Sequence, residues 1–491
     1  MRLSTAALAS LPSSVRRPRY DRAAGDIGIV HLGVGAFHRA HQAVILEDCL
    51  ERGDTGWAIA GASLRSAETR DALEPQDTLY TLSTRSAAGE DLRVIGALRE
   101  SHVAPENPGA LLARMAAPTT RIVSLTVTEK GYCHDPATGE LNEAHPDIRH
   151  DLAHPEAPRS AIGYLARALV LRRAAGLAPF TVLCCDNLPA NGRTVKRVID
   201  RFSTLLSPEF GRWVGDRVLC PASMVDRIVP ATTDEDRARI SAALGVEDRW
   251  PVVTEPFWQW VVEDRFSLGR PDLAAAGVEL VADVTPFEHM KLRLLNGSHS
   301  TLAYLGYLAG FETVAETMTD PAFATLIREM MAEDITPTLA MPAGTDLAGY
   351  ARALIERFRN PALRHRTWQI AMDGSQKLPQ RLLGTARDRL AKGAPIGRLA
   401  LGIAGWMRYV SGTDEKGAAI DLRDPMAERL TSIAAEAGPV ATRLAPALMA
   451  IPEIFGTDLP ADPRFFVPVT AALESLFRDG AARTVAGYAP R

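Results

Sequence analysis

The stretch HLGVGAFHRAH, residues 31–41, links a short apolar run to an amphipathic one. The run DIGIVHLG at residues 26–33 is rich in β-branched residues and stops at glycines, and helical periodicity then extends over residues 36–53. Strand, tight turn and helix in this order are typical of the start of a parallel α/β sheet. Gly33 and Gly35 would allow backbone N–H groups to approach a phosphate at the start of the helix.

Strand-like and helical patterns continue to alternate after residue 53. Four further apolar, β-rich runs lie at residues 57–64, 120–129, 180–187 and 251–257. A helical pattern at residues 160–176 separates two of them, which predicts a mostly parallel, doubly wound sheet.

After about residue 285 the apolar residues recur with a 3.6-residue period and strand-like runs almost disappear. The sequence therefore predicts two domains: an N-terminal Rossmann-like α/β domain over residues 1–284 and a mainly α-helical domain over residues 285–491.

The composition is that of an ordinary globular protein, with 46% hydrophobic and 23% charged residues. The 55 Lys and Arg against 59 Asp and Glu give a net charge of −4 without long single-sign runs, which argues against a nucleic-acid or membrane partner. The five cysteines include an adjacent pair and favour a reducing compartment. With no signal-like or membrane-spanning run, we expect a cytoplasmic protein, monomeric or a small homo-oligomer.

The opening turn lacks the third glycine of the GxGxxG fingerprint, because His38 occupies that position. His38 and His41 could share a helix face as metal ligands, but no third ligand lies nearby in the sequence. We therefore predict a dinucleotide site and no metal. Its expected cofactor-binding residues are Gly33, Gly35, Ala36, Phe37 and Arg65.

The choice between NAD and NADP stays open at this point. An acidic side chain at the end of the second strand would bind the ribose hydroxyls of NAD. The stretch GASLRSAETR, residues 61–70, instead offers Arg65 and Ser66 before Glu68.

A second group of polar residues interrupts the apolar segment EHMKLRLLNGSHS, residues 288–300. At about 100° per residue from Lys291, Glu288 lies near 60°, His299 near 80° and Asn296 near 140° on one helix face. Such a face is often just the solvated side. If it is buried, desolvation lowers the pKa of a lysine and makes it a usable general base, while Asn and His can bind hydroxyls and an oxyanion.

Two shorter stretches carry suitable side chains at the ends of expected elements. CCDNLPANG, residues 184–192, ends a strand and offers Asn187 as a neutral donor. DGSQKLPQR, residues 373–381, offers Lys377 in a turn-rich loop. Either stretch taken alone is more often structural.

Six motifs in this order resemble the mannitol dehydrogenase family of polyol-specific long-chain dehydrogenases, from about residue 25 to near the end. They are HLGVGAFHRAH (31–41), TVTEKGYC (126–133), CCDNLPANG (184–192), MVDRIVP (224–230), KLRLLNGSHS (291–300) and DGSQKLPQR (373–381). The resemblance implies a zinc-independent enzyme that binds NAD(H) in its N-terminal domain. It also implies these roles: Lys291 as general acid/base, Asn187 and Asn296 polarising the reacting oxygen, His299 and Lys377 orienting substrate hydroxyls, Asp226 facing the cleft, and Glu288 relaying the proton of the lysine.

Within the family the sequence is most similar to the fructuronate reductase (mannonate oxidoreductase) branch. Lys130 stands where similar mannitol dehydrogenases carry a glycine, and Gln369 where they carry an arginine. A uronate needs a cation for its carboxylate, and Lys130, Arg366, Lys377 and Arg381 are the alternatives. Surface or structural pairing is the other interpretation of Lys130 and the arginines.

The resemblance thus implies reversible reduction of D-fructuronate to D-mannonate with NAD, with NADP not excluded. The alternative is a mannitol 2-dehydrogenase acting on D-mannitol and D-fructose, or a related polyol enzyme such as an arabinitol dehydrogenase. A non-catalytic nucleotide sensor on the same fold is the alternative from another class.

Overall fold

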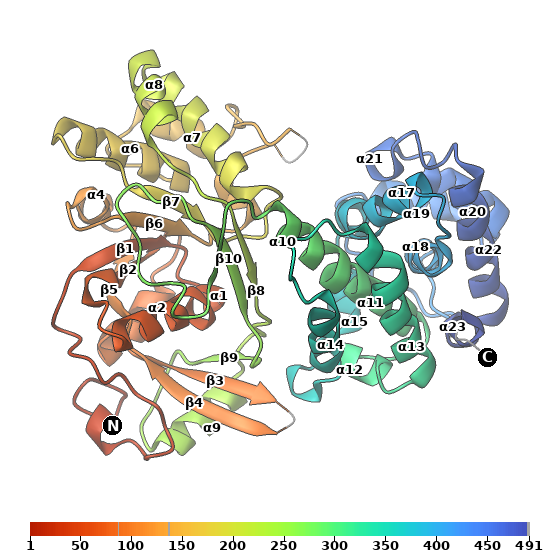
Figure 1. The fold of residues 1–491 in the computed structure, drawn as a ribbon, viewed down its shortest axis with the longest axis horizontal. Coiled ribbons are helices and arrows are strands. Elements are labelled where there is room, and N and C mark those ends of the chain that lie inside the picture. Colours follow the sequence, from red (N-terminus) through yellow and green to blue (C-terminus); the bar gives the residue numbers. More distant parts are fainter. Residues whose placement is uncertain (87, 136–137, 489–491) are drawn as a thin grey trace. The chain divides into compact units, whose positions relative to one another are not determined.

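A computed structural model describes residues 1–86, 88–135 and 138–488 of the chain. They form two compact units, Met1–Thr285 and Pro286–Arg491, and each is described by itself (Figure 1).

The first unit is built on a five-stranded parallel sheet in the order β5-β2-β1-β6-β7. Its strands are β1 (Ile27–Leu32), β2 (Ala58–Ser63), β5 (Leu98–Val103), β6 (Ile122–Leu125) and β7 (Thr181–Cys184). The chain adds β2 and β5 on one side of β1 and then returns to add β6 and β7 on the other. The change of direction between β1 and β6 is a topological switch point, where open α/β sheets bind ligands.

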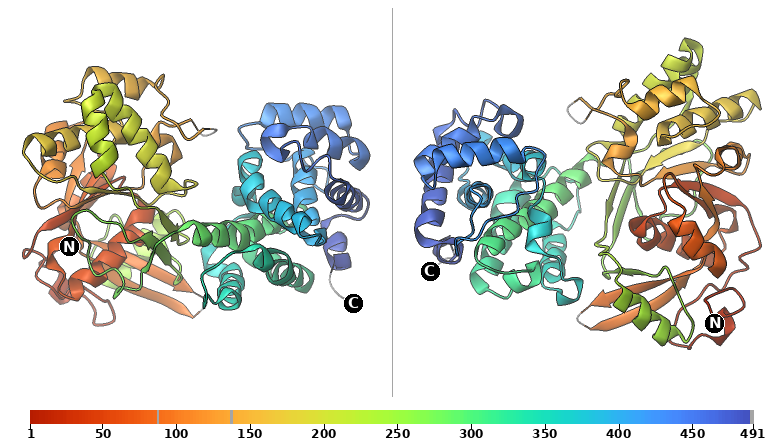
Figure 2. Two further views of the ribbon diagram at one scale, coloured as in Figure 1. Left: turned by 45° about the horizontal axis from the view of Figure 1, so that its top comes forward. Right: turned by 180° about the vertical axis from the view of Figure 1, so that it is seen from behind.

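Helices cover both faces of this sheet (Figures 1 and 2). Alternate residues of a strand point to opposite faces, and in β1 Val30 and Leu32 join one apolar core while Ile29 joins the other. Helices of the first core are α4 (Pro108–Ala116), α6 (Ala161–Ala174) and α7 (Asn191–Leu206); those of the second are α1 (Ala36–Ala40) and α2 (Gln42–Glu51). The predicted Rossmann-like, doubly wound class is confirmed.

Two small sheets complete the first unit, and one corrects the sequence analysis. The run at residues 251–257 does form a strand, β9 (Val252–Thr254), but it pairs with β3 in a separate sheet instead of joining the parallel one. The remaining strands are β3 (Tyr80–Ser86), β4 (Gly89–Ile95), β8 (Ser223–Asp226), β10 (Gln259–Glu263) and β11 (Glu279–Val281), in the orders β4-β3-β9 and β11-β10-β8. The other helices of this unit are α3 (Glu68–Leu73), α5 (Pro146–Ala153), α8 (Pro208–Arg217) and α9 (Asp234–Leu244).

The single helix expected over residues 36–53 is divided into α1 and α2 at His41. The backbone of His41 leaves the helical region, with φ −123° and ψ −89°, and its ring bonds to the carbonyl of Gln259 in β10 at 2.9 Å. The helix expected over residues 160–176 is α6, whose N-terminus is capped by the hydroxyl of Ser160.

The second unit is helical, and the part of it that the structure describes contains no strand. A continuous helical run consists of α10 (Thr285–Met290), a first π segment (Lys291–Gly297) and α11 (Ser298–Leu308). Helix α11 packs against α18 (Gly397–Val410) and α15 (Thr367–Ala371), and α18 packs against α22 (Pro463–Asp479). The other helices are α12 (Val314–Thr317), α13 (Pro321–Glu329), α14 (Leu347–Phe358), α16 (Gly374–Leu378), α17 (Gly384–Ala391), α19 (Ala427–Ala437), α20 (Ala441–Met449), α21 (Pro452–Phe455) and α23 (Ala481–Tyr488), with further π segments at Met330–Ile335 and Pro379–Leu383.

The first π segment changes the geometry on which the predicted polar face depended. Hydrogen bonds in a π-helix span five residues instead of four, so the rotation per residue is smaller than the 100° of an α-helix. Even so, Lys291 is 4% exposed and His299 is 7% exposed. Glu288 and Asn296 are partly exposed.

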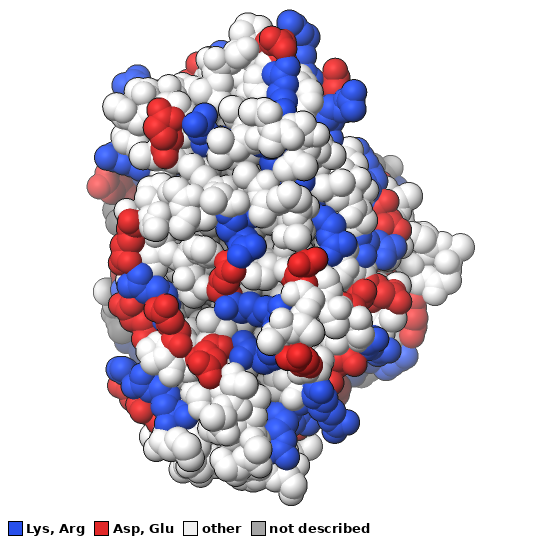
Figure 3. Space-filling view, turned by 90° about the vertical axis from the view of Figure 1, so that its left-hand side faces the viewer, with Lys and Arg blue, Asp and Glu red and all other residues white. Residues whose placement is uncertain are grey.

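No helix in the described ranges 1–86, 88–135 and 138–488 combines the length and apolar character needed to cross a membrane. On the face drawn in Figure 3, acidic and basic side chains are interspersed.

Candidate functional site

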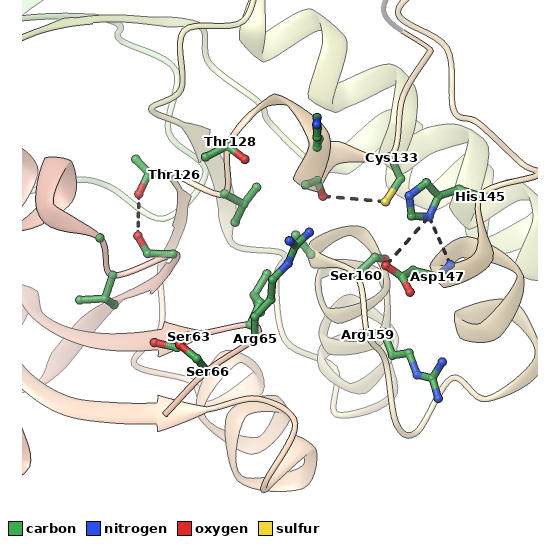
Figure 4. A pocket seen from close by; sticks show the side chains of 18 residues that line it. Ser63, Arg65, Ser66, Thr126, Thr128, Cys133, His145, Asp147, Arg159 and Ser160 are labelled. Atoms are coloured by element: carbon green, nitrogen blue, oxygen red, sulfur yellow. Dashed lines mark hydrogen bonds and ion pairs between the residues drawn. The ribbon is translucent and has the colours of Figure 1, made fainter. Parts of the chain in front are cut away.

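A cavity in the first unit opens at the carboxyl ends of β1, β2 and β6 (Figure 4). The turn Gly33–Gly35 after β1, residues Ser63–Ser66 after β2 and residues Thr126–Thr128 after β6 line it. The cavity thus lies at the topological switch point of the sheet, where a dinucleotide binds in a Rossmann fold.

The two glycines of the turn have different structural roles. Gly33 has φ +97°, and a Cβ there would stand 2.2 Å from the carbonyl oxygen of Thr126, so only glycine fits. Gly35 is exposed, and a Cβ there would meet only the oxygen of Gly33 at 3.9 Å. Gly35 thus lines the cavity with no side chain in front of its backbone, while its N–H donates to the carbonyl of Gly33 at 2.7 Å.

A buried polar network holds this turn from below. The hydroxyl of Thr126 donates to the carbonyl oxygen of Gly33 at 2.8 Å and lies 2.8 Å from Nε2 of His31. Because Thr126 uses its proton on Gly33, Nε2 of His31 carries the proton that Thr126 accepts, and Nδ1 accepts from Ser124 at 2.8 Å. Burial lowers the pKa of His31 to about 3, which keeps the ring neutral.

The two histidines of the opening motif are internal. The ring of His38, at the place of the missing glycine, is buried and stacks on the ring of His31 with centroids 3.4 Å apart. Burial also lowers the pKa of His38 well below its usual value. The described residues contain no group of three or more His, Cys, Asp or Glu side chains arranged to hold a metal ion.

The cavity carries cationic side chains that suit an anionic ligand. Arg65 and Lys130 are both exposed and line it, and Arg65 extends from the end of β2 into the cavity in Figure 4. Glu68, the first acid after β2, starts α3 and does not line the cavity. Cations beside an open glycine backbone fit the phosphates of a dinucleotide.

Not every residue expected to bind the cofactor reaches this cavity. Gly33, Gly35 and Arg65 line it, whereas Ala36 and Phe37 do not. The ring of Phe37 stacks on that of His41 with centroids 5.1 Å apart. Lys130, one of the four candidates for a substrate carboxylate, lines this cavity together with the glycine turn.

The loop after β7 carries Asn187, which is exposed. Its neighbour Asp186, which the sequence analysis missed, fixes the loop: one carboxylate oxygen accepts from the backbone N–H of Val127 at 2.8 Å and from the hydroxyl of Tyr132 at 2.7 Å. Asp186 therefore joins the loop after β7 to the loop after β6.

The other end of the same loop is tied to β8. The side-chain amide of Asn191 donates to the carbonyl of Ser223 at 2.7 Å, and its oxygen accepts from the N–H of Ser223 at 3.0 Å. Strand β8 ends at Asp226, which is buried. Asn191 thus ties the loop that carries Asn187 to the first residue of β8, the strand that ends at Asp226.

In the second unit, His299 lies among aromatic and charged side chains. Its ring stacks on Phe358 with centroids 5.1 Å apart and meets the edge of His365 at 4.7 Å. Burial lowers the pKa of His299 well below its usual value, and the nearby His365 and Arg381 lower it further. The ring is therefore neutral and can both donate and accept hydrogen bonds.

Lys377 and Arg381 belong to the same group. Lys377 donates to the carbonyl of Met372 at 2.5 Å, and its amine lies 3.8 Å from the carboxylate of Asp373. Burial lowers the pKa of Lys377 to about 8, and the charge of Arg381 contributes. Arg381 donates to the hydroxyl of Ser300 at 3.0 Å, which places it next to His299 on α11.

Other polar side chains of the second unit are exposed or bonded elsewhere. Arg366 and Gln369 are exposed at the start of α15. Arg293, two residues after Lys291, bonds to Asp388 at 2.5 Å and to Thr338 at 3.0 Å. His365, which does lie in the group, was missed because no local pattern distinguishes it from a surface histidine.

Two family descriptions match the chain: "Mannitol dehydrogenase Rossmann domain" over residues 27–275 and "Mannitol dehydrogenase C-terminal domain" over residues 283–477. A D-mannonate oxidoreductase of Escherichia coli is 50% identical over 96% of this chain and 98% of that protein. A mannitol 2-dehydrogenase of Phaeosphaeria nodorum is 44% identical over 97% and 84%.

Solved structures agree with these similarities. The ternary complex of Pseudomonas fluorescens mannitol 2-dehydrogenase with NAD and D-mannitol superposes with a TM-score of 0.86 at 40% identity, over 99% of both chains. A substrate-free D-sorbitol dehydrogenase gives a TM-score of 0.91 at 34% identity, over 99% of this chain and 100% of that one.

The Rossmann-type sheet, the glycine turn and these similarities define an NAD-dependent dehydrogenase of polyols or sugar acids. The chain belongs to the mannitol dehydrogenase family, as its six motifs predicted.

Proposed function

We propose that the protein catalyses the reversible reduction of D-fructuronate to D-mannonate with NADH. The observation that carries the reaction type is the burial of Lys291, which is 4% exposed at the start of a π segment. π-Helical turns are frequent at functional sites. The substrate assignment is supported by the 50% identity to a D-mannonate oxidoreductase over nearly the full length of both chains.

In this proposal Lys291 acts as the general acid and base. In reduction its ammonium donates a proton to the oxygen of the substrate carbonyl, and in oxidation its neutral amine removes that proton from the hydroxyl. Glu288, three residues earlier on the same helical run, relays the proton to solvent. When bound, the nicotinamide cofactor exchanges a hydride with the reacting carbon.

Neutral amides and an imidazole complete the proposed site. Asn187 and Asn296 donate hydrogen bonds to the oxygen on which negative charge develops. His299, whose ring is neutral, and Lys377 bind substrate hydroxyls, and Asp226 accepts from another hydroxyl. Residues of both units are assigned to one reaction, so the proposal requires changes in either unit to abolish turnover.

For the cofactor we propose NAD, held in the cavity of the first unit by the backbone at Gly35 and by Arg65. The roles follow the division of the chain: residues 1–284 bind the cofactor, and residues 285–491 supply the general base and most substrate contacts. Because no acidic side chain follows β2 directly, the proposal also allows NADP to bind.

A second candidate function is a mannitol 2-dehydrogenase, or a related polyol enzyme such as an arabinitol dehydrogenase. It is favoured by the TM-score of 0.86 with the Pseudomonas fluorescens mannitol 2-dehydrogenase complex. Gln369 argues against it, because the resemblance places an arginine there in mannitol dehydrogenases.

The test is the oxidation of NADH with D-fructuronate and with D-fructose, measured side by side and repeated with NADPH. We expect a higher kcat/KM for D-fructuronate. The variant Lys291→Ala should lose turnover while binding NADH normally, whereas Lys416→Ala, a change at an exposed lysine of the same unit, should leave both unchanged. A preference for D-fructose would reject the substrate, and turnover by Lys291→Ala would reject the mechanism.

A further inference from the structure

Arg381 differs from Arg293, Arg389 and Arg398 of the second unit in how its charge is balanced. Arg293, Arg389 and Arg398 each pair with a carboxylate, at 2.5, 3.3 and 2.9 Å respectively. A guanidinium has five N–H donors, and within the described part of the chain Arg381 uses one of them, on the neutral hydroxyl of Ser300 at 3.0 Å. No carboxylate of residues 1–86, 88–135 or 138–488 lies within ion-pair distance of Arg381.

Burial lowers the pKa of Arg381 to about 10, but its remaining donors are not completely enclosed. None of its nitrogens is among the buried side-chain atoms that lack a partner, and the side chain as a whole is partly exposed. A cation with unused donors that reach solvent can bind an anionic ligand without first breaking an internal ion pair.

The backbone brings Arg381 beside the proposed catalytic helix. Arg381 lies in a second π segment, Pro379–Leu383, which packs against the first π segment, Lys291–Gly297. The approach is so close that a Cβ on Gly297 would stand 2.6 Å from the carbonyl oxygen of Arg381. The guanidinium then reaches Ser300, the residue after His299.

A second cation shares this place. Lys377 lies four residues before Arg381. The positive charge of Arg381 is close enough to Lys377 to lower the pKa of its amine. The carboxylates nearest to the pair are weak counter-ions: Asp373 is 3.8 Å from Lys377, and Asp424 accepts from the backbone and hydroxyl of Ser375 at 2.8 and 2.5 Å. Two like charges held together favour an anion that touches both.

We propose that Arg381 is the residue that recognises the carboxylate of the substrate, with Lys377 as its partner. The inference rests on the proposed function, because it presupposes a sugar-acid substrate. It selects between the four cations that the sequence offered: Lys130 lies at the dinucleotide cavity of the first unit, and Arg366 is exposed at the start of α15. Arg381 gives the site a planar fork that matches the two oxygens of a carboxylate, which a polyol lacks.

The test compares a substrate that has the carboxylate with one that has a hydroxymethyl group in its place. The kcat/KM for D-fructuronate and for D-fructose is measured for the wild type, Arg381→Gln and Arg381→Lys. Loss of a charge-assisted contact predicts that Arg381→Gln lowers kcat/KM for D-fructuronate by roughly 10- to 100-fold more than for D-fructose. Arg381→Lys should recover part of the loss, because it keeps the charge but not the fork.

The control variant is Arg352→Gln, which removes a positive charge from a side chain of α14 that is 73% exposed. Arg352→Gln should leave kcat/KM unchanged for both D-fructuronate and D-fructose. Binding of D-mannonate to the enzyme–NADH complex, measured by calorimetry, provides a readout independent of turnover. Arg381→Gln should weaken D-mannonate binding and leave NADH binding unchanged.

The outcomes separate the inference from the proposed function. Suppose that the wild type reduces D-fructuronate, and that Arg381→Gln lowers kcat/KM equally for both substrates or for neither. Arg381 then does not recognise the carboxylate, and the inference alone is rejected. If the wild type fails to reduce D-fructuronate, the proposed function is rejected and the inference with it. A selective loss of D-fructuronate supports both.

Discussion

The hydroxyl of Thr126 donates to the carbonyl of Gly33 at 2.8 Å, so the loop after β6 holds the turn after β1 in place. Replacing Thr126 with Val leaves the N–H of His31 and the carbonyl of Gly33 without this partner in a buried network. A lost buried hydrogen-bond partner costs about 1 to 3 kcal/mol. We expect Thr126→Val to bind NADH roughly tenfold more weakly in a fluorescence titration. Thr126→Ser, which keeps the hydroxyl, should bind like the wild type, and equal binding by Thr126→Val would contradict the role of the network.

Gly297 allows the two π segments to approach. In Gly297→Ala the new Cβ would lie 2.6 Å from the oxygen of Arg381, so the backbone must move. Overpacking of this kind costs about 1 to 3 kcal/mol, and we expect a lower midpoint of thermal unfolding and lower kcat. The matched control is Gly215→Ala in α8, where a Cβ meets nothing within 4 Å and stabilisation by up to about 1 kcal/mol is expected. Unchanged stability and activity in Gly297→Ala would show that the segments can separate freely.

Glu47 makes the stability of the first unit depend on pH. Burial raises the pKa of Glu47 to about 7, although Tyr20 and the N–H of Gly96 donate to its carboxylate. Since the folded pKa lies above the unfolded one, the contribution to stability is full below about pH 4.5 and is lost as the pH rises through about 7. Relative to the wild type, Glu47→Gln should gain about 2 to 3 kcal/mol of unfolding free energy between pH 4 and pH 8.

Denaturant unfolding followed by tryptophan fluorescence at several pH values measures this difference. The exposed Glu235 of α9 provides the control, and Glu235→Gln should show no such trend. A constant difference between Glu47→Gln and the wild type across the pH range would mean that Glu47 is already ionised near pH 5.

Lys377 should limit the binding of a sugar acid at alkaline pH. Burial lowers the pKa of Lys377 to about 8, so its positive charge is largely present at pH 7 and largely lost at pH 9. We expect the affinity for D-mannonate in the presence of NADH to fall by up to about tenfold over this interval, in proportion to the protonated fraction. Lys377→Arg, which stays protonated, should remove the dependence. An affinity that is constant from pH 7 to pH 9 in the wild type would exclude Lys377 as a partner of the carboxylate.

The local parts of the fold were predictable from the sequence, because apolar periodicity and glycines mark β1, its turn and α6. The hairpin of β3 and β4, and its pairing with β9, were not predicted. Pairing between strands some 170 residues apart leaves no local signal, so the run at residues 251–257 was assigned to the wrong sheet.

The sequence could group Lys291, Asn296 and His299 because one motif carries all three, and their roles in a site stay a prediction. The π segment was not predictable, since nothing in KLRLLNG distinguishes a five-residue hydrogen-bond span from a four-residue one. A single sequence shows neither the burial of a side chain nor its contacts with distant residues. The structural roles of His31, Asp186 and His365 depend on both. Lys130 was one of four cations considered for a uronate carboxylate, and the sequence alone does not show that it lines the cavity of the glycine turn.

Asp186 connects the loop after β7 with the loop after β6 in the first unit. One carboxylate oxygen holds the N–H of Val127 and the hydroxyl of Tyr132, while the next residue along the chain is Asn187. Any ligand that orders the loop carrying Asn187 therefore also restrains the loop that flanks the nucleotide cavity. Thermodynamic reciprocity makes any coupling between a ligand at Asn187 and a ligand in this cavity equal in both directions.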